Sequence, residues 1–181
     1  TGEVVDCIYA VQELAPMGEL FDYVQFSKFD DCMIRVFAKQ LFAGIKHMKD
    51  VGFCHRDLKP ENVVVDQNFN LKIIDWGFAK AYTEGTLTQT FFGSGAYMAP
   101  EIRAREEYDA HKADMFSLGV LLFVLKMRNY PWTSAQDNSS KYGLICLNRP
   151  ELFWKGWQPK GQPDCFDADF KDLLNNLYKR D

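Results

Sequence analysis

Hydrophobic residues recur along the chain with spacings that predict three helices. At about residues 30–50 they return every three or four positions, which predicts an amphipathic helix whose start Asp30 or Asp31 can cap. Residues 111–128 are apolar almost all round, so we expect this helix to be buried. Residues 167–180 show a second amphipathic pattern. The inward positions are Ile34, Phe37, Leu41, Ile45 and Met48 in the first helix and Phe170, Leu173, Leu174 and Leu177 in the last.

Other segments have the composition of strands, turns and loops. Residues 4–14 are rich in Val, Ile and Tyr, which predicts one or two buried strands, and residues 18–26 read as a short helix. Residues 63–75 predict two short strands around a turn rich in Asp and Asn. Residues 76–100 have no period and are rich in Thr, Gly and Ser. A loop of this length inside a compact domain is usually functional.

Composition and charge argue against several classes of protein. The 181 residues suit one domain, and the 47% hydrophobic content is enough for a core. A net charge of −4 with scattered Lys and Arg argues against a nucleic-acid-binding surface. The five cysteines share no C-x-x-C spacing, which suggests free thiols in a reducing compartment. The longest apolar run, 118–125, is too short to cross a bilayer, and no signal peptide is visible, so we expect no membrane partner and a cytoplasmic or nuclear protein.

The candidate chemistry lies in "HRDLKPEN", residues 55–62, and "IIDWG", residues 73–77. A tight hairpin between them returns its ends to one place, so Asp57, Asn62 and Asp75 can converge. Two carboxylates and an amide oxygen are hard ligands that suit Mg²⁺. An ionised Asp beside a metal-bound phosphate can orient a hydroxyl and accept its proton, and Lys59 can reach a transferring phosphoryl group. These residue types therefore indicate phosphoryl transfer to a hydroxyl.

The motifs "HRDLKPEN", "DWG" and "MAPE" occur in this order, and in this the chain resembles the eukaryotic protein kinases. It looks like the serine/threonine type, close to the calcium/calmodulin-dependent or cyclic-nucleotide-dependent groups. The resemblance implies an α+β fold with a mainly helical C-terminal lobe and a β-hairpin at the catalytic loop. It assigns residues 1–17 to the end of the small lobe and the hinge, and residues 18–181 to the large lobe, truncated before its last helix. Because no G-x-G-x-x-G loop or V-A-I-K strand occurs, we expect a kinase domain whose N-terminal lobe is largely missing.

The resemblance also implies roles for single residues. Asp57 would be the catalytic base, and Lys59 would support the transferring phosphoryl group. Asn62 and Asp75 would bind Mg²⁺, and Ser94 would bond both the base and the lysine.

The cofactors implied are ATP and Mg²⁺, with ATP held at a hinge in "VQELAPMGEL", residues 11–20. Backbone groups of Glu13 and Ala15 would meet the adenine edge, and Val64 would form the floor beneath it. Glu19 would meet the ribose or a basic substrate side chain.

Residues 76–100 would form the activation segment of such a kinase. Thr90 matches the main activating phosphosite, which an activating kinase would modify, and Arg56 is the natural partner of that phosphate. Thr83, Thr86 and Thr88 remain competing sites. Asp114 resembles the buried aspartate that fixes the backbone of the catalytic loop.

The function expected is ATP-dependent phosphoryl transfer to Ser or Thr hydroxyls of protein substrates, which can carry an upstream Arg recognised by Glu19 or Glu61. The alternative is a catalytically inactive kinase-like scaffold or binding module, although Asp57, Lys59, Asn62 and Asp75 are all retained. A small-molecule phosphotransferase is a third option, which "MAPE" and the long segment before it disfavour. We expect the 181 residues alone to bind Mg-ATP poorly and to transfer phosphate slowly or not at all.

Overall fold

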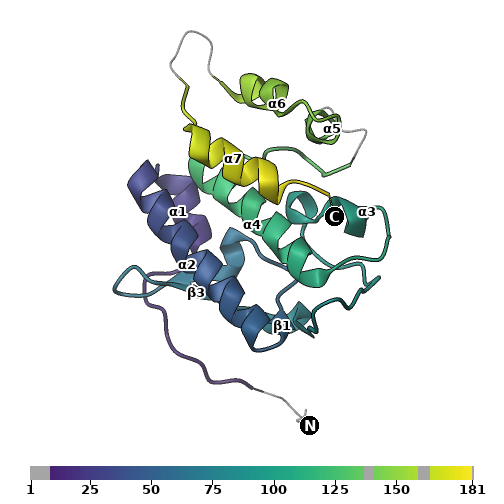
Figure 1. Ribbon diagram of the computed structural model, residues 1–181. Helices are drawn as coiled ribbons and strands as arrows, with labels where there is room; N and C mark the ends of the chain where they lie inside the picture. The colour runs from purple at the N-terminus through teal and green to yellow at the C-terminus, as the bar shows by residue number, and fades with distance from the viewer. Residues whose placement is uncertain (1–8, 137–140, 159–163, 181) are drawn as a thin grey trace, which may run out of the picture.

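The computed structural model describes residues 9–136, 141–158 and 164–180, and helix α4 lies at the centre of its helical part (Figure 1). This helix, Ala110–Met127, is buried along nearly all of its length, as its uninterrupted apolar composition predicts. Asp109 caps it, because its side chain accepts hydrogen bonds from the backbone N–H groups of His111 and Lys112. The prediction of a buried helix at residues 111–128 is confirmed.

Two amphipathic helices pack against α4. Helix α2, Asp31–Asp50, buries the five apolar positions that its spacing predicted, and the Asp30 carboxylate accepts from the N–H of Met33 at 2.7 Å to cap it. Helix α7, Ala168–Leu177, is capped by Asp167 and buries Leu174 fully, while its other predicted inward residues are partly buried against the core. At Gly119 the backbone of α4 comes so close to α7 that an added Cβ would lie 3.0 Å from Leu177. Both helix predictions are confirmed.

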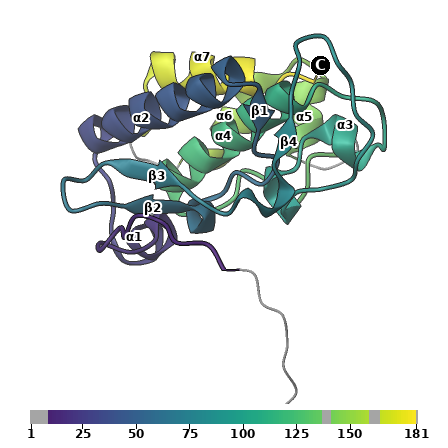
Figure 2. The same cartoon turned by 90° about the horizontal axis from the view of Figure 1, so that it is seen from below.

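A short antiparallel hairpin follows the loop that contains Asp57. Strand β2, Val63–Val65, pairs with β3, Leu71–Ile73, with Val64 opposite Lys72. The Asp66 side chain shapes the turn, because its Oδ1 atom accepts from two backbone N–H groups of the turn at 2.8 Å. Seen from below, the hairpin lies between α1, Leu20–Phe26, and α2 (Figure 2). The predicted short helix and hairpin are therefore confirmed.

The remaining elements are short. Strand β1, Phe53–Cys54, pairs with β4, Lys80–Ala81, and neither was predicted. Residues 76–100 are otherwise irregular, as expected, apart from two single-turn 3-10 helices. The short helices are Pro60–Asn62, Trp76–Phe78 and Gly95–Tyr97, of the 3-10 type, and α3 (Pro100–Arg103), α5 (Tyr142–Cys146) and α6 (Pro150–Trp157).

The prediction of buried strands at residues 4–14 is wrong for residues 9–14. Residues 9–14 form no strand, and their large side chains are exposed: 85% for Tyr9, 91% for Val11 and 82% for Leu14. A strand needs a neighbour for its backbone hydrogen bonds, and no strand of the described residues pairs with this segment. Residues 4–8 lie outside the described residues.

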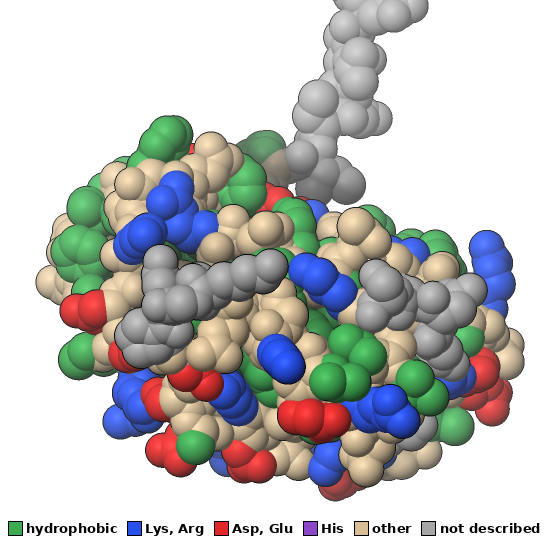
Figure 3. Space-filling model, turned by 90° about the horizontal axis from the view of Figure 1, so that it is seen from above, with side chains coloured by type: hydrophobic (Ala, Val, Ile, Leu, Met, Phe, Trp, Pro, Cys, Tyr) green, Lys and Arg blue, Asp and Glu red, His purple; other side chains and the backbone are tan. Residues whose placement is uncertain are grey.

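The face formed by the C-terminal helices carries cationic and anionic side chains interspersed with apolar ones (Figure 3). Beneath it, aromatic rings from α4, α5, α6 and the segments that join them pack together, and several pairs meet edge to face. Trp132, for example, lies 4.9 Å from Tyr142 and 4.7 Å from Tyr178, measured between ring centroids. Across the described ranges, no helix combines the length and the apolar character that crossing a membrane requires. The α+β architecture, mainly helical with a hairpin after the Asp57 loop, is as expected.

Candidate active site

The loop at residues 55–62 connects β1 to β2, and a side chain of α4 holds its first two residues in place. Asp114, fully buried on that helix, accepts hydrogen bonds from the backbone N–H groups of His55 and Arg56, both at 2.7 Å. Burial, opposed by these two hydrogen bonds, raises the pKa of Asp114 to about 7. Arg56 has a φ of 68°, a left-handed conformation that is rare outside glycine. The start of the loop is thus held by a side chain that lies 58 residues away from Arg56.

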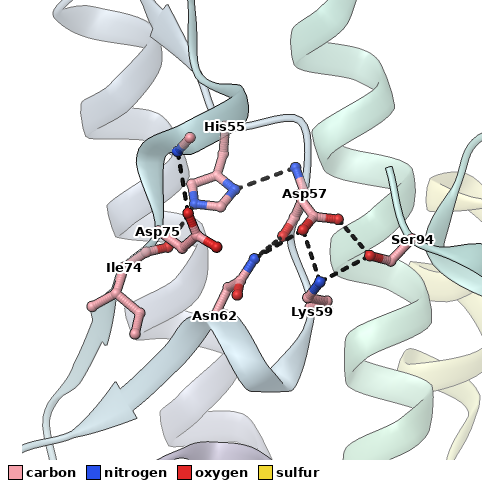
Figure 4. Close-up of polar contacts among 8 residues, drawn as sticks. His55, Asp57, Lys59, Asn62, Ile74, Asp75 and Ser94 are labelled. Atoms are coloured by element: carbon pink, nitrogen blue, oxygen red, sulfur yellow. Dashed lines mark hydrogen bonds and ion pairs between the residues drawn. The ribbon is translucent and has the colours of Figure 1, made fainter. Parts of the chain in front are cut away.

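The Asp57 side chain accepts hydrogen bonds from three other side chains (Figure 4). Its Oδ1 accepts from the Ser94 hydroxyl at 2.7 Å, and its Oδ2 accepts from Lys59 Nζ at 2.8 Å and from the Asn62 amide at 3.1 Å. Lys59 also donates to Ser94 Oγ at 2.9 Å. Burial opposes the charge, but the hydrogen bonds from Lys59 and Ser94 outweigh it and lower the pKa of Asp57. The side chain is therefore an oriented carboxylate at neutral pH.

Asp75 reaches the same region from the end of the hairpin. The N–H of Ile74 donates to the backbone oxygen of Asn62 at 2.9 Å, which joins the segment after β3 to the loop. Asp75 has a φ of 60°, and one of its carboxylate oxygens accepts from the N–H of Gly77 at 3.2 Å. Figure 4 shows the side chains of Asp57, Asn62 and Asp75 converging on one region.

The donor set fits a small divalent cation. The Asn62 amide nitrogen is occupied by two hydrogen bonds to Asp57, so its oxygen is left as the free end of the side chain. The second carboxylate oxygen of Asp75 has no hydrogen-bond partner within the described ranges. In those ranges no cluster of three or more His, Cys, Asp or Glu side chains could hold a metal ion. A pair of oxygen ligands nevertheless suits Mg²⁺, which usually keeps water and phosphate ligands beside one or two protein groups.

His55 links two parts of the site. Its Nε2 lies 2.9 Å from the carbonyl oxygen of Ile74, which can only accept, so Nε2 carries the proton. Its Nδ1 in turn accepts from the N–H of Asp57 at 3.3 Å. Burial lowers the pKa of His55, and the ring packs edge-on against Trp76 at 5.2 Å. The neutral ring thus connects the loop of Asp57 to the segment of Asp75.

Two of the residues expected at the nucleotide-binding site, Glu13 and Glu19, contact the hairpin. Residues 17–19 run alongside β2. The N–H of Met17 donates to the backbone oxygen of Val65 at 3.2 Å, and Glu19 forms an isolated bridge with Val64. Glu13 is exposed and its carboxylate lies 3.3 Å from Lys72 Nζ on β3, while Ala15 is half-buried. The structure thus brings Glu13 and Glu19 to the hairpin that also carries Val64.

Arg56 connects the loop to residues 76–100. Its Nη1 donates to the Thr90 hydroxyl at 2.7 Å, and its Nε donates to the backbone oxygen of Phe78 at 2.6 Å. The guanidinium also lies 5.0 Å from the centre of the Phe92 ring. The side chain is thus already directed at the residue whose phosphate it was expected to bind.

A pocket of about 620 Å³ beside this site was not predicted. It begins at Lys59 and Ser94, and its wall includes Trp132 and Trp157, which come from segments far along the chain. Its side also carries Glu61, whose Oε2 atom is buried without a hydrogen-bond partner among the described residues. No periodicity or spacing links these positions in the sequence, so only the fold reveals them.

Comparison with known proteins agrees with the motifs found in the sequence. The family profile described as "Protein kinase domain" matches residues 3–181. The chain is 40% identical over 140 residues, 75% of its length, to serine/threonine-protein kinase chk1 of Schizosaccharomyces pombe. It is 36% identical over 178 residues, 96% of its length, to CBL-interacting protein kinase 26 of Oryza sativa subsp. japonica. It is 34% identical over 171 residues, 94% of its length, to the probable serine/threonine-protein kinase MARK-B of Dictyostelium discoideum.

These relatives are longer proteins. The matched region covers 28% of the fission yeast protein, 34% of the rice protein and 23% of the Dictyostelium protein. The chain therefore spans about a third or less of the curated relatives that it matches.

Proposed function

The chain belongs to the protein kinase family, with relatives of the serine/threonine type, and on this premise we propose that it performs ATP-dependent phosphoryl transfer to Ser or Thr hydroxyls of protein substrates. The observation that carries the proposal is the geometry of Asp57. Its two carboxylate oxygens are held by Lys59, Ser94 and Asn62, in a loop that the Asp75 segment adjoins.

In this proposal Asp57 orients the substrate hydroxyl and accepts its proton. Its lowered pKa keeps it ionised at neutral pH, so it is always available as an acceptor. Lys59, 2.8 Å from Asp57, places a positive charge where the phosphoryl group would arrive, and Ser94 fixes both side chains. These residues supply position and charge, which dominate phosphoryl transfer.

The cofactors proposed are ATP and Mg²⁺. The side-chain oxygens of Asn62 and Asp75 would hold the metal ion, which, when bound, neutralises charge on the phosphates. Backbone groups of Glu13 and Ala15 would meet the adenine edge with Val64 beneath it, and Glu19 would reach the ribose. The path of residues 17–19 along β2 supports this arrangement, because it aligns that segment with the strand carrying Val64.

Substrate choice and regulation extend the proposal. The buried Glu61 oxygen in the pocket beside Ser94 suits an Arg side chain upstream of the phosphoacceptor, as does the exposed Glu19. An activating kinase would phosphorylate Thr90, and the 2.7 Å contact with Arg56 would become a charge-assisted pair that orders residues 76–100. Among the described residues, Cys32, Cys54 and Cys165 carry free thiols, which supports a cytoplasmic or nuclear location.

The test is phosphate transfer by the full-length protein from γ-labelled ATP to a peptide library containing Ser and Thr. Asp57→Asn should lower kcat by about 10²–10⁴-fold while nucleotide binding is retained, because the amide cannot accept the proton. The control is Asp50→Asn, which alters only an exposed ion pair with Lys46. An inactive scaffold would bind substrates while the wild type and Asp57→Asn transfer equally little phosphate, and that result would overturn the proposal.

A further inference from the structure

The backbone that follows Ser94 is held at three successive carbonyl oxygens. Ser94 directly precedes the single 3-10 turn Gly95–Tyr97, and its hydroxyl donates to Asp57 (Figure 4). Each residue of that turn accepts a hydrogen bond on its carbonyl oxygen from a side chain elsewhere in the chain. In the order of the turn, the donors are Arg103 of α3, Trp132 after α4, and Ser117 of α4.

The indole of Trp132 is fixed in position by the rings around it. It is 3% exposed, and its ring centroid lies 4.9 Å from that of Tyr142 and 4.7 Å from that of Tyr178. Its Nε1 donates to the backbone oxygen of Ala96 at 3.1 Å. An indole N–H can only donate and a carbonyl oxygen can only accept, so this contact specifies where the carbonyl of Ala96 points.

The other two donors act on either side of this bond. The hydroxyl oxygen of Ser117 lies 2.8 Å from the backbone oxygen of Tyr97, closer than the 3.1 Å to that of Ala113. Arg103 Nη2 donates to the backbone oxygen of Gly95, which has a φ of 39°. Glycine has the largest conformational freedom of any residue, so the direction of its carbonyl depends on an external donor.

Holding this turn also fixes the side chain that precedes it. The N–H of Tyr97 donates to the backbone oxygen of Ser94 at 2.9 Å, which closes the turn. The Ser94 hydroxyl lies 2.7 Å from Asp57 Oδ1 and 2.9 Å from Lys59 Nζ, so a shift of the turn would lengthen both contacts. The bond from Ser94 is one of the causes that lower the pKa of Asp57, which connects the turn to the proposed base.

We propose that Arg103, Ser117 and Trp132 are positioning residues for the phosphoryl transfer, which hold the backbone of residues 95–97 so that the Ser94 hydroxyl stays on Asp57. The inference rests on the proposed function, because it gives these side chains a role in the same reaction. Their hydrogen bonds end at the backbone of the turn, so they act through Ser94 and not on the reacting atoms.

The experiment compares Trp132→Phe with Trp154→Phe in the full-length protein, by phosphate transfer to a peptide substrate and by urea unfolding. Trp154 is a matched control, because it is 5% exposed, belongs to the same group of packed rings, and donates from Nε1 to Asn175 of α7 at 3.0 Å. Each variant loses one indole N–H and the same volume. We expect Trp132→Phe to lower kcat about tenfold, less than the about 10²-fold that a 1 Å misplacement causes, and Trp154→Phe to stay within about twofold of the wild type.

A double-mutant cycle shows whether Trp132 acts through Ser94. In a Ser94→Ala protein, Trp132→Phe should lower kcat no further, because the hydroxyl that it positions is gone. A further tenfold loss there would overturn the proposal. Arg103→Met, which keeps the stem of the side chain and removes the donor to Gly95, should behave as Trp132→Phe does and provides the test if Trp132→Phe does not fold.

A ¹³C NMR titration of the Asp57 carboxyl group gives a measurement that does not depend on catalysis. In Trp132→Phe we expect the pKa of Asp57 to rise toward its ordinary value as the bond from Ser94 weakens, and in Trp154→Phe to remain as in the wild type. Equal titration curves for Trp132→Phe and the wild type would also overturn the proposal. If the wild type transfers no phosphate, the proposed function is wrong, while the titration still decides whether Trp132 holds Ser94 on Asp57.

Discussion

Replacing Asp114 with Asn tests how the loop that carries Asp57 is held in position. In the wild type both carboxylate oxygens accept from backbone N–H groups, those of His55 and Arg56, at 2.7 Å. An amide offers only one acceptor oxygen, so one of the two N–H groups would face the NH₂ group of Asn. The substitution keeps the size of the side chain and removes one hydrogen bond inside a fully buried site.

The expected loss of stability follows from the unsatisfied donor. A buried N–H without an acceptor costs about 1–3 kcal/mol, so we expect the free energy of unfolding to fall by that amount. Arg56, with its φ of 68°, holds a conformation that costs about 1–2 kcal/mol and that the second hydrogen bond helps to maintain. Relaxation of this residue would move Asp57. A displacement of about 1 Å lowers a rate by about 10²-fold, which sets the scale of the expected loss in kcat.

The pH dependence of stability gives an independent measure of the same group. Burial raises the pKa of Asp114 in the folded protein to about 7, above the value near 3.9 in an unfolded chain. The folded state therefore binds a proton between these values that the unfolded state does not. The stabilisation from this linkage is fully present below about pH 4 and is lost as the pH rises through about 7. Asp114→Asn has no such group, so this component of the slope should disappear.

The assay is urea unfolding between pH 4 and pH 8, together with kcat of the full-length protein. The control is Asp109→Ala on the same helix, which removes a cap and the hydrogen bond that the Tyr82 hydroxyl donates to Asp109. It should cost about 1–3 kcal/mol without removing a hydrogen bond of the loop. Unchanged unfolding free energy and unchanged kcat in Asp114→Asn would refute the role given to the carboxylate. A loss of activity in Asp109→Ala as large as in Asp114→Asn would show that stability alone, rather than loop geometry, accounts for the effect.

Three further predictions concern the site and the packing of the helices. Lys59→Met should raise the pKa of Asp57, which can be followed by ¹³C NMR of its carboxyl carbon. The stability that Asp57 contributes is present above its ordinary pKa and is lost as the pH falls through its lowered folded-state pKa, so in Lys59→Met this loss should begin at a higher pH than in the wild type. An unchanged titration would contradict the ion pair. Gly119→Ala should destabilise the chain by about 1–3 kcal/mol because the new Cβ would lie 3.0 Å from α7. The control is Gly156→Ala, whose Cβ would have no atom within 4 Å and should stabilise α6 by about 0.5–1 kcal/mol. Equal effects of the two substitutions on urea unfolding would show that the close approach of α4 and α7 is unimportant. Asp30→Ala should cost about 1 kcal/mol by removing the cap of α2, and Asp30→Asn should restore most of it, whereas equal losses in the two variants would argue against capping.

The sequence predicts most of the helical framework because helix period and burial are local signals. The five apolar positions of α2 and the uninterrupted apolar run of α4 determine which faces are buried whatever surrounds them. Strands depend on partners, and here the prediction is weaker. β1 and β4 have two residues each, too few for a pattern, and residues 9–14 have the composition of a strand but no strand of the described residues beside them.

The candidate site likewise has features that the sequence predicts and features that depend on distant parts of the chain. The grouping of Asp57, Asn62 and Asp75 could be predicted because a hairpin of known length joins them. The contact between Arg56 and Thr90 depends on the path of an irregular segment, and its residues were assigned by resemblance to kinases rather than by local pattern. The pocket beside Ser94 could not be predicted, since its wall is assembled from parts of the chain that only the fold brings together.

The Ser94 hydroxyl that donates to Asp57 has a consequence for the timing of the proposed reaction. It is an alcohol of the same kind as the group to be phosphorylated, and it already occupies one side of the carboxylate before any substrate arrives. The Asp57 side chain is therefore fixed in one orientation when the protein folds. The lone pairs of its carboxylate that remain free are already oriented when the hydroxyl of a substrate binds. The entropy of fixing that side chain is lost once per protein molecule and not at each turnover.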